Sequence, residues 1–259
     1  MKNPLPGLLA LALLTACATS PLGRKTLRFF PEGEMAQMGA AAFQETREKT
    51  PESKDGKQNA YVTCIAGALT REVPGDQAWE VVVFEDKAAN AFALPGGKIG
   101  VYTGLLRVAR SQDQLAAVIG HEIAHVTAQH ANERVSTAFA AQAGLNIVDA
   151  IYGGTSAGQN AMALLGLGTQ VGILLPFGRA QESEADLLGL DTMARAGFDP
   201  REAVTLWQNM AQAGGGAPPE FLSTHPSHDT RIEDLQKRMP EALKLYDAAR
   251  VAGKKPKCG

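Results

Sequence analysis

The feature that most constrains this chain is the pentapeptide His121-Glu122-Ile123-Ala124-His125, because its two histidines must lie on one helix to act together. Hydrophobic residues around it recur at helical spacing, and Ser111 and Gln114 fit a capping box at the helix start. Side chains four residues apart share a helix face, so both imidazoles can bind one metal ion. Zinc bound in this way makes water reactive at neutral pH, and Glu122 is placed to accept the proton. The sequence therefore predicts a catalytic site with one Zn²⁺ per chain.

Catalytic zinc also needs a third protein ligand, and two regions offer candidates. His130 lies five residues after His125, a spacing that rotates it off the ligand face, so we expect it to make a polar contact between helices. Glu182 is the better candidate, since it shares a predicted helix face with Asp186. One of these carboxylates can bind metal while the other orients a histidine ligand. Glu184 points elsewhere on that helix, and we expect it to be solvated.

The N-terminus is typical of an export signal. A basic residue precedes an apolar run, Leu5–Leu14, that is too short to span a membrane. The run ends in Leu14-Thr15-Ala16-Cys17, which resembles the lipobox of bacterial lipoproteins, in which the cysteine carries the lipid. We therefore predict a lipoprotein signal peptide over residues 1–16, then a lipidated Cys17 and tether over residues 17–32. The alternative is an ordinary signal peptide cleaved near a cysteine.

By the same resemblance, Ala18 after the lipobox favours the periplasmic face of the outer membrane of a Gram-negative bacterium. That compartment is oxidising, and with Cys17 lipidated, Cys64 and Cys258 remain as a candidate disulfide pair. The alternative is two free thiols. A bond would join the C-terminal tail to the N-terminal part of the domain.

Two strand-like runs precede the long helical region. They are Trp79–Phe84 and Lys98–Thr103, with the turn sequence Pro95-Gly96-Gly97 between them. These runs predict a small β-sheet or hairpin beside the active-site helix. We place one mostly helical α+β domain over residues 33–250, followed by a C-terminal tail over residues 251–259.

Helices are predicted at 33–49 and after Asp199-Pro200, with Gly197 ending the preceding helix. The apolar, Gly-rich segment Ala161–Phe177 has a polar pair in its middle and is short for a membrane span. We expect a mobile loop and helix near the active site there, with membrane contact as the alternative.

Composition excludes several function classes. The 25 Lys and Arg residues nearly balance the 27 Asp and Glu residues and form no basic cluster, so we expect no nucleic-acid partner. A charged fraction of 20% with 45% hydrophobic residues also excludes a disordered chain.

The HExxH sequence followed by Glu182-x-x-Ala185-Asp186 resembles the HtpX/CAAX-prenyl-protease family of zinc endopeptidases, a gluzincin group. The resemblance implies a zincin-type metallopeptidase fold. It also implies that His121, His125 and Glu182 bind zinc, that Glu122 is the general base, and that Asp186 hydrogen-bonds to His121.

The run from Asn90 to Gly97 is similar to the family's segment beside the cleft. The resemblance implies substrate contacts through four consecutive residues, since an extended peptide can pair with an edge strand: Asn90, Ala91, Phe92 and Ala93. The alternative is a hairpin turn with no substrate contact.

The run Ser223-Thr224-His225-Pro226 with Arg231 is similar to the family's Thr-His-Pro…Arg element. It implies that His225 either stabilises the oxyanion or binds zinc as a reversible fourth ligand that holds the enzyme inactive. It also implies that Arg231 faces the cleft and stabilises the developing oxyanion.

These patterns predict a zinc metalloendopeptidase that is anchored to the membrane by lipid and cleaves unfolded or misassembled envelope proteins in quality control. Within the family, the chain is most similar to small periplasmic lipoproteins. One alternative is a chaperone-like outer-membrane assembly factor with latent proteolysis. Another is a metal-dependent hydrolase of a different class.

Overall fold

A computed structural model describes residues 17–152, 177–213, 220–226 and 230–259 of the chain. The predicted signal peptide over residues 1–16 lies outside the described residues, and so does the predicted loop Ala161–Phe177 except for its last residue. Among the residues described, no helix is both long and apolar enough to cross a membrane.

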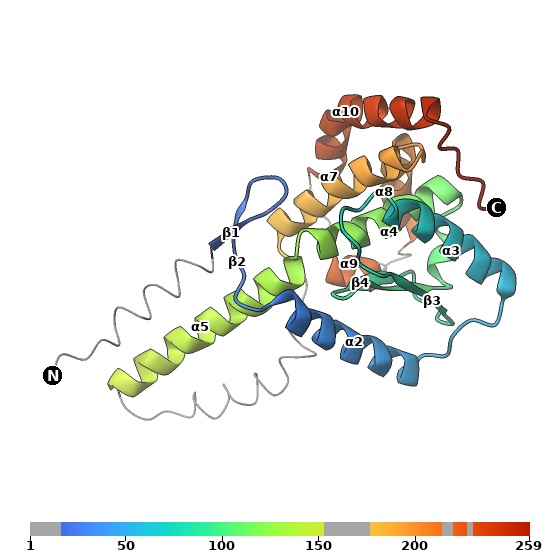
Figure 1. The fold of residues 1–259 in the computed structure, drawn as a ribbon. Coiled ribbons are helices and arrows are strands. Elements are labelled where there is room, and N and C mark those ends of the chain that lie inside the picture. Colours follow the sequence, from blue (N-terminus) through green and yellow to red (C-terminus); the bar gives the residue numbers. More distant parts are fainter. Residues whose placement is uncertain (1–16, 153–176, 214–219, 227–229) are drawn as a thin grey trace.

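A three-stranded sheet lies between two layers of helices (Figure 1). β3 (Glu80–Phe84) pairs in parallel with β5 (Lys98–Tyr102), and β4 (Ala91–Leu94) pairs antiparallel with the other side of β5. β4 is therefore an edge strand. The predicted turn Pro95-Gly96-Gly97 joins β4 to β5, not β3 to β5 as the two strand-like runs suggested.

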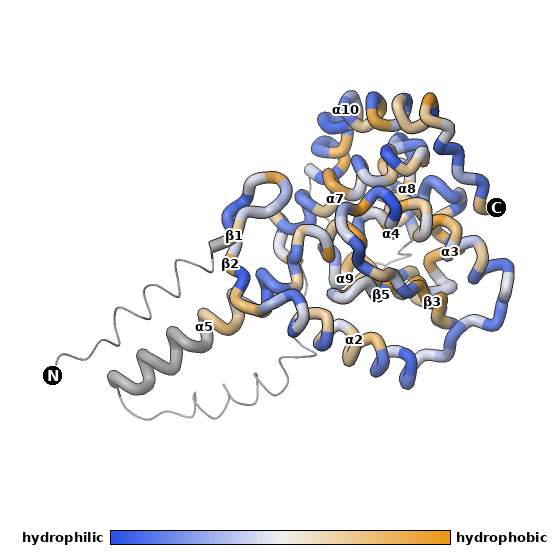
Figure 2. Tube along the Cα trace, in the orientation of Figure 1, coloured by the Kyte–Doolittle hydropathy of each residue, from blue (hydrophilic) through white to orange (hydrophobic). Residues whose placement is uncertain are grey.

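Successive side chains of these strands point to opposite faces of the sheet, and each face packs against its own layer of helices. Val83 and Val101 pack in the main core with α3 (Gly56–Thr70) and α4 (Gln112–Thr127). On the opposite face, Phe84 and its neighbours pack against α2 (Glu32–Lys49). Figure 2 shows that the connection between α2 and α3 and the C-terminal tail are mainly hydrophilic.

The remaining elements follow in chain order around this core. Two short strands, one 3-10 turn and five helices complete the described part of the chain: β1 (Cys17–Thr19), β2 (Lys25–Leu27), η1 (Leu105–Arg107), α5 (His130–Tyr152), α7 (Arg179–Arg195), α8 (Arg201–Ala213), α9 (Glu220–Thr224) and α10 (Arg231–Val251). The mostly helical α+β fold class is confirmed.

α4 runs through the centre of the domain and is buried from Gln114 to His125. Ser111 caps its N-terminus by accepting a hydrogen bond from the Gln114 amide, as predicted. The capping box is incomplete, because the Gln114 side chain accepts a hydrogen bond from the Arg110 amide instead of that of Ser111. The Ser111 cap therefore fixes where the helix with the HExxH sequence begins.

The segment expected to be a tether is folded. β1 and β2 form an antiparallel hairpin, and the chain after it donates hydrogen bonds to α5, from Phe29 to Ser136 and from Phe30 to Asn132. This N-terminal hairpin, residues 17–27, is thus attached to the domain. Lipidation of Cys17, the first residue of β1, and a lipid anchor stay predictions.

The C-terminal tail is held against the domain as well. Cys64 of α3 and Cys258 form a disulfide that joins positions 194 residues apart. Beside it, the Gln112 side chain accepts a hydrogen bond from the Cys258 amide and donates one to the Pro256 carbonyl. The tail therefore supports the start of α4.

Candidate metal centre and active site

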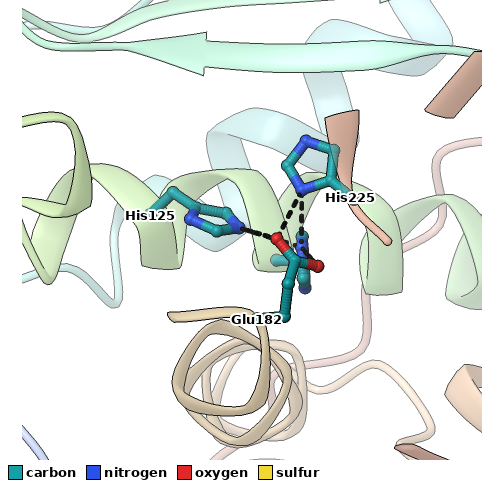
Figure 3. Close-up of side chains that lie close together, drawn as sticks. His125, Glu182 and His225 are labelled. Atoms are coloured by element: carbon teal, nitrogen blue, oxygen red, sulfur yellow. Dashed lines mark hydrogen bonds and ion pairs between the residues drawn. The ribbon is translucent and has the colours of Figure 1, made fainter. Parts of the chain in front are cut away.

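Four buried side chains meet at the centre of the molecule, and we call them the His–His–Glu–His cluster: His121, His125, Glu182 and His225. The first two come from α4, Glu182 comes from α7, and His225 directly follows α9. Each offers one ligand atom, and these atoms all lie within 4.8 Å of one another. Figure 3 shows three of these side chains converging on one point.

The geometry of the cluster fits a zinc ion. His121 Nε2 lies 3.0 Å from His125 Nε2 and 3.2 Å from His225 Nδ1, and Glu182 Oε1 lies 3.4 Å from His125 Nε2. Ligand atoms around a tetrahedral zinc ion lie about 3.4 Å apart, given zinc–ligand bonds of about 2.1 Å. Imidazole nitrogens and a carboxylate oxygen are also ligands that zinc prefers. The structure thus brings the three predicted ligands together with His225, for which the sequence left open a role as fourth ligand.

The buried charges of the cluster shift its titration. Burial raises the pKa of Glu182, but contacts with His121, His125 and His225 outweigh it and hold that pKa well below its usual range. Burial lowers the pKa of His121, yet Asp186 and Glu182 raise it to about 10. Burial dominates at His125, whose pKa falls well below the ordinary value. Glu182 is consequently an ionised carboxylate at neutral pH.

Asp186 supports the cluster from the next turn of α7. Its Oδ1 lies 2.9 Å from Nδ1 of His121, as expected. Arg231 joins this pair by donating hydrogen bonds to Asp186 Oδ2 at 2.7 Å and to Glu182 Oε2 at 2.5 Å. Because Asp186 occupies Nδ1 of His121, the lone pair of Nε2 is free to bind a metal ion.

The expectation that Arg231 faces the cleft is wrong. The residue is only 2% exposed, and its guanidinium lies 3.9 Å from the centre of the Trp207 ring. Both partners of its guanidinium are carboxylates of α7, so its charge is used within the protein. These contacts favour a role for Arg231 in positioning the two carboxylates of α7.

Glu122 lies between the cluster and the sheet. Its Oε2 accepts a hydrogen bond from the Ala93 amide at 3.2 Å, and its Oε1 lies 3.4 Å from His225 Nε2. Burial raises the pKa of this carboxyl group. A carboxylate with a raised pKa next to a metal-binding cluster is suited to accept and return a proton.

A cleft of about 1120 Å³ passes the cluster and the edge strand β4. The segment Asn90–Ala93 lines it, together with Glu122, His125 and His225. The Phe92 ring, however, packs against the rings of Phe84 and Tyr102 on the α2 side of the sheet. The edge strand therefore offers the cleft mainly its backbone.

The sequence missed two residues of this cleft. Phe177 lies with its ring centre 3.7 Å from that of His125, and its amide donates a hydrogen bond to the Thr224 carbonyl. The Arg134 guanidinium lies 3.7 Å from the Phe177 ring centre, and burial lowers its pKa to about 10. Arg134 follows His130 by four residues, so a shared face of α5 was the available signal.

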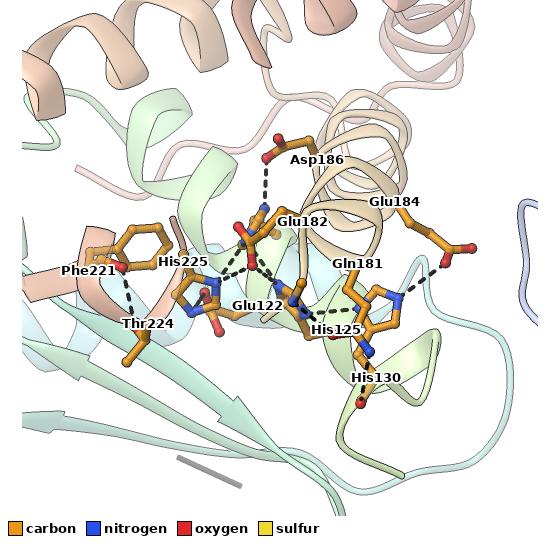
Figure 4. A network of polar contacts seen from close by, with 12 residues as sticks. Glu122, His125, His130, Gln181, Glu182, Glu184, Asp186, Phe221, Thr224 and His225 are labelled. Carbon is orange, nitrogen blue, oxygen red and sulfur yellow. Dashed lines mark hydrogen bonds and ion pairs between the residues drawn. The ribbon is translucent and has the colours of Figure 1, made fainter. Parts of the chain in front are cut away.

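The expectation that Glu184 is solvated is also wrong. Glu184 is 4% exposed and accepts hydrogen bonds from the Leu22 amide and from Arg24 of the N-terminal hairpin. His130 lies 3.2 Å from the same carboxylate and, as expected, is absent from the cluster (Figure 4). Burial raises the pKa of Glu184, but His130 and the hairpin groups outweigh it and lower the pKa to about 2.

The chain is similar in sequence to several known metalloendopeptidases and proteases. The chain is 42% identical over 176 residues to the mitochondrial metalloendopeptidase OMA1 of Schizosaccharomyces pombe, covering 64% of this chain and 48% of the relative. It is 33% identical over 243 residues to the human mitochondrial metalloendopeptidase OMA1, covering 87% of this chain and 45% of the relative. The beta-barrel assembly-enhancing protease of Escherichia coli is 27% identical over 214 residues, covering 80% of this chain and 44% of the relative. The chain thus spans about half the length of these relatives.

These relatives overturn one expectation. Proteins with the OMA1 name from fission yeast, Arabidopsis, budding yeast, cattle and humans are mitochondrial. The prediction of a bacterial outer-membrane location on the periplasmic face is therefore wrong. It depended on the short lipobox-like sequence, which carries no information about the folded domain. The narrower resemblance to the HtpX/CAAX-prenyl-protease group and its small lipoprotein members stays a prediction.

The family itself is shown by a match over most of the chain. The sequence pattern of peptidase family M48 matches residues 53–239, a span that contains the whole cluster, Glu122, Asp186 and Arg231. The chain belongs to peptidase family M48, a family of zinc-dependent metallopeptidases.

Proposed function

We propose that this protein is a zinc metalloendopeptidase that cleaves extended segments of unfolded or misassembled proteins. The observation that carries the proposal is the position of Glu122, whose carboxylate bridges the His–His–Glu–His cluster and the edge strand. One of its oxygens accepts a hydrogen bond from the Ala93 amide, and the other lies 3.4 Å from His225 of the cluster. Metal site, proton acceptor and peptide-binding edge are thus adjacent.

The cluster residues His121, His125 and Glu182 would hold the zinc ion. When bound, zinc lowers the pKa of water and polarises the carbonyl of the peptide bond. Glu122 accepts the proton from the attacking water and returns it to the amine of the departing product. Its burial, which raises its pKa, favours both halves of this transfer.

The edge strand supports the choice of an extended substrate. β4 pairs with β5 on one side only, and residues from Asn90, directly before the strand, to Ala93 line the cleft. A peptide that adds to such an edge must be unfolded over several residues. Unfolded or misassembled proteins expose segments of this kind, whereas compact folded proteins expose few.

A second reading is favoured by His225. Structural zinc sites have four protein ligands, whereas catalytic sites keep one position open. With His225 in the cluster, four protein side chains surround the metal position. A metal ion held by all four would have no open position for water, which supports a resting state with latent proteolysis. In that state the protein would bind unfolded segments without cleaving them.

The test is to measure cleavage of unfolded casein and zinc content for the wild-type protein and for Glu122→Gln. We expect about one zinc ion in both proteins, and a loss of cleavage of at least about 100-fold in the variant, which is typical for removal of a general base. Full activity in the variant would exclude Glu122 as the proton acceptor. Absence of zinc in both proteins would refute the metal centre.

A further inference from the structure

The two histidines of the HExxH sequence have different partners on their outer sides. His121 contacts a carboxylate directly, through Nδ1 and Asp186. His125 instead contacts a second imidazole: its Nδ1 lies 2.9 Å from Nδ1 of His130. His130 is 0% exposed, and its Nε2 lies 3.2 Å from Oε2 of Glu184. Figure 4 shows this chain of side chains leading away from the cluster.

The donors and acceptors in this chain can be assigned from the carboxylate end. An ionised carboxylate only accepts, so the His130 Nε2 atom must carry the proton that faces Glu184. Neutral His130 then has its lone pair on Nδ1, and this lone pair can accept only from Nδ1–H of His125. With its proton on Nδ1, His125 has its free lone pair on Nε2, which is the atom inside the cluster.

The N-terminal hairpin holds the carboxylate end of the chain. The Leu22 amide donates to Glu184 Oε1 at 3.1 Å, and Arg24 Nε donates to Oε2 at 3.0 Å. The same guanidinium donates two further hydrogen bonds to Glu133, at 2.5 and 2.6 Å. Glu184 is therefore fixed between His130 on one side and groups of the hairpin on the other, which lie more than 150 residues away in sequence.

We propose that His130 and Glu184 are positioning residues that aim Nε2 of His125 at the zinc ion, and that Arg24 of the N-terminal hairpin fixes this pair. The inference rests on the zinc centre proposed above. At His121, the carboxylate of Asp186 contacts the metal-binding histidine directly. At His125, the carboxylate of Glu184 acts through the imidazole of His130 instead. The hairpin thereby becomes part of the metal centre's support, although it is far from the HExxH sequence.

The test is the zinc affinity of the full-length protein, measured by competition with a chelator of known affinity, for His130→Ala, Glu184→Gln and Arg24→Gln. Loss of an outer partner of a metal-binding histidine weakens metal binding by about 10- to 100-fold, and we expect this for His130→Ala and Glu184→Gln. The Arg24→Gln variant should show a smaller loss in the same direction. His130→Asn should recover part of the affinity, because its side-chain carbonyl can accept the proton of His125.

Asp191→Asn is the matched control. Asp191 is a 6% exposed carboxylate of the same helix, α7, and it is ion-paired with Arg238 at 2.6 Å. Among the contacts that the structure describes, Asp191 has none with His130 or Glu184. The zinc affinity of Asp191→Asn should therefore equal that of the wild type, even if the variant is less stable. The visible spectrum of the cobalt-substituted protein provides a second readout, since it responds to ligand geometry and not to stability. It should change in the Glu184→Gln variant and not in the control.

The outcomes separate this inference from the zinc centre itself. A wild-type protein that binds no zinc would refute both. A wild-type protein with normal zinc binding, together with unchanged affinity and spectrum in Glu184→Gln and His130→Asn, would refute only the positioning role. A His130→Ala variant that does not fold leaves the decision to those two milder substitutions.

Discussion

Gly189 of α7 lies directly against Gly120 of α4. A Cβ atom on Gly189 would lie 2.8 Å from the amide nitrogen of His121, and one on Gly120 would lie 3.0 Å from the carbonyl oxygen of Gly189. The backbones of the two helices therefore touch one residue before the first histidine of the cluster. This contact sets how far Glu182 of α7 stands from the histidines of α4.

Gly189→Ala should push the two helices apart. Overpacking of this kind costs about 1 to 3 kcal/mol of stability, and the displaced Glu182 should weaken zinc binding as well. Chemical denaturation and chelator competition measure the two effects. Gly67→Ala is the control, since the nearest atom to its new methyl group is 3.9 Å away. That variant should gain about 0.5 to 1 kcal/mol and bind zinc normally. Normal zinc binding by Gly189→Ala would show that the helix contact does not control the metal centre.

Arg231→Gln should destabilise the protein strongly. The substitution leaves the carboxylates of Glu182 and Asp186 buried without their shared cation, and removal of one partner from a buried ion pair costs about 3 to 5 kcal/mol. We expect a large fall in the free energy of unfolding and weaker zinc binding, both measurable without substrate. A variant of normal stability and zinc affinity that had lost only kcat would instead indicate a role at the oxyanion.

His225→Ala should raise the rate of casein cleavage. His225 supplies one of the four ligand atoms of the cluster, so its removal opens a position at the metal. Zinc content should stay near one per chain because His121, His125 and Glu182 remain. A large fall in cleavage with zinc retained would assign His225 to stabilisation of the oxyanion instead.

The ion pair between Arg24 and Glu133 should make stability depend on pH. Burial raises the pKa of Glu133, but the hydrogen bonds from Arg24 and Gln181 outweigh it and lower the pKa in the folded state. A lowered folded-state pKa contributes stability above the unfolded value of about 4.3, and this contribution is lost as pH falls through the folded value. Arg24→Gln should therefore be less stable than the wild type by about 1 to 2 kcal/mol at pH 7, since water screens part of the pair.

The free energy of unfolding of the wild type and of Arg24→Gln should be measured at pH 7 and again at pH 3. The difference between wild type and Arg24→Gln should shrink at the lower pH. A difference that is equal at both pH values would show that Arg24 stabilises the protein without pairing its charge to Glu133 or Glu184.

The parts of the site that the sequence predicted are those set by position along one helix. The spacing of His121 and His125, and of Glu182 and Asp186, places each pair on one helical face whatever the rest of the chain does. The edge strand was predicted from its resemblance to a segment beside the cleft, and the sheet confirms it. The pairing of β3 with β5 was not predictable in this way, because a parallel neighbour depends on the connection between strands.

The parts that the sequence could not predict depend on packing between distant segments. Glu184 lies two residues after Glu182, so it faces away from the cluster, where the N-terminal hairpin and His130 of α5 bury it. Arg231 was expected at the cleft because its run resembles the family's Thr-His-Pro…Arg element, but that motif carries no information about which side of α7 meets α10. The structure places it behind the cluster, where its charge is shared by two carboxylates.

The groups that form and support the metal centre are spread over more than 200 residues of sequence, from Arg24 to Arg231. Because synthesis proceeds from the N-terminus, the ribosome delivers Arg231 after every other member of this assembly. A nascent chain therefore contains the HExxH helix long before it contains the arginine that neutralises the carboxylates beside it. A chain released before Arg231 is added would carry its histidines without the cation that holds Glu182 and Asp186.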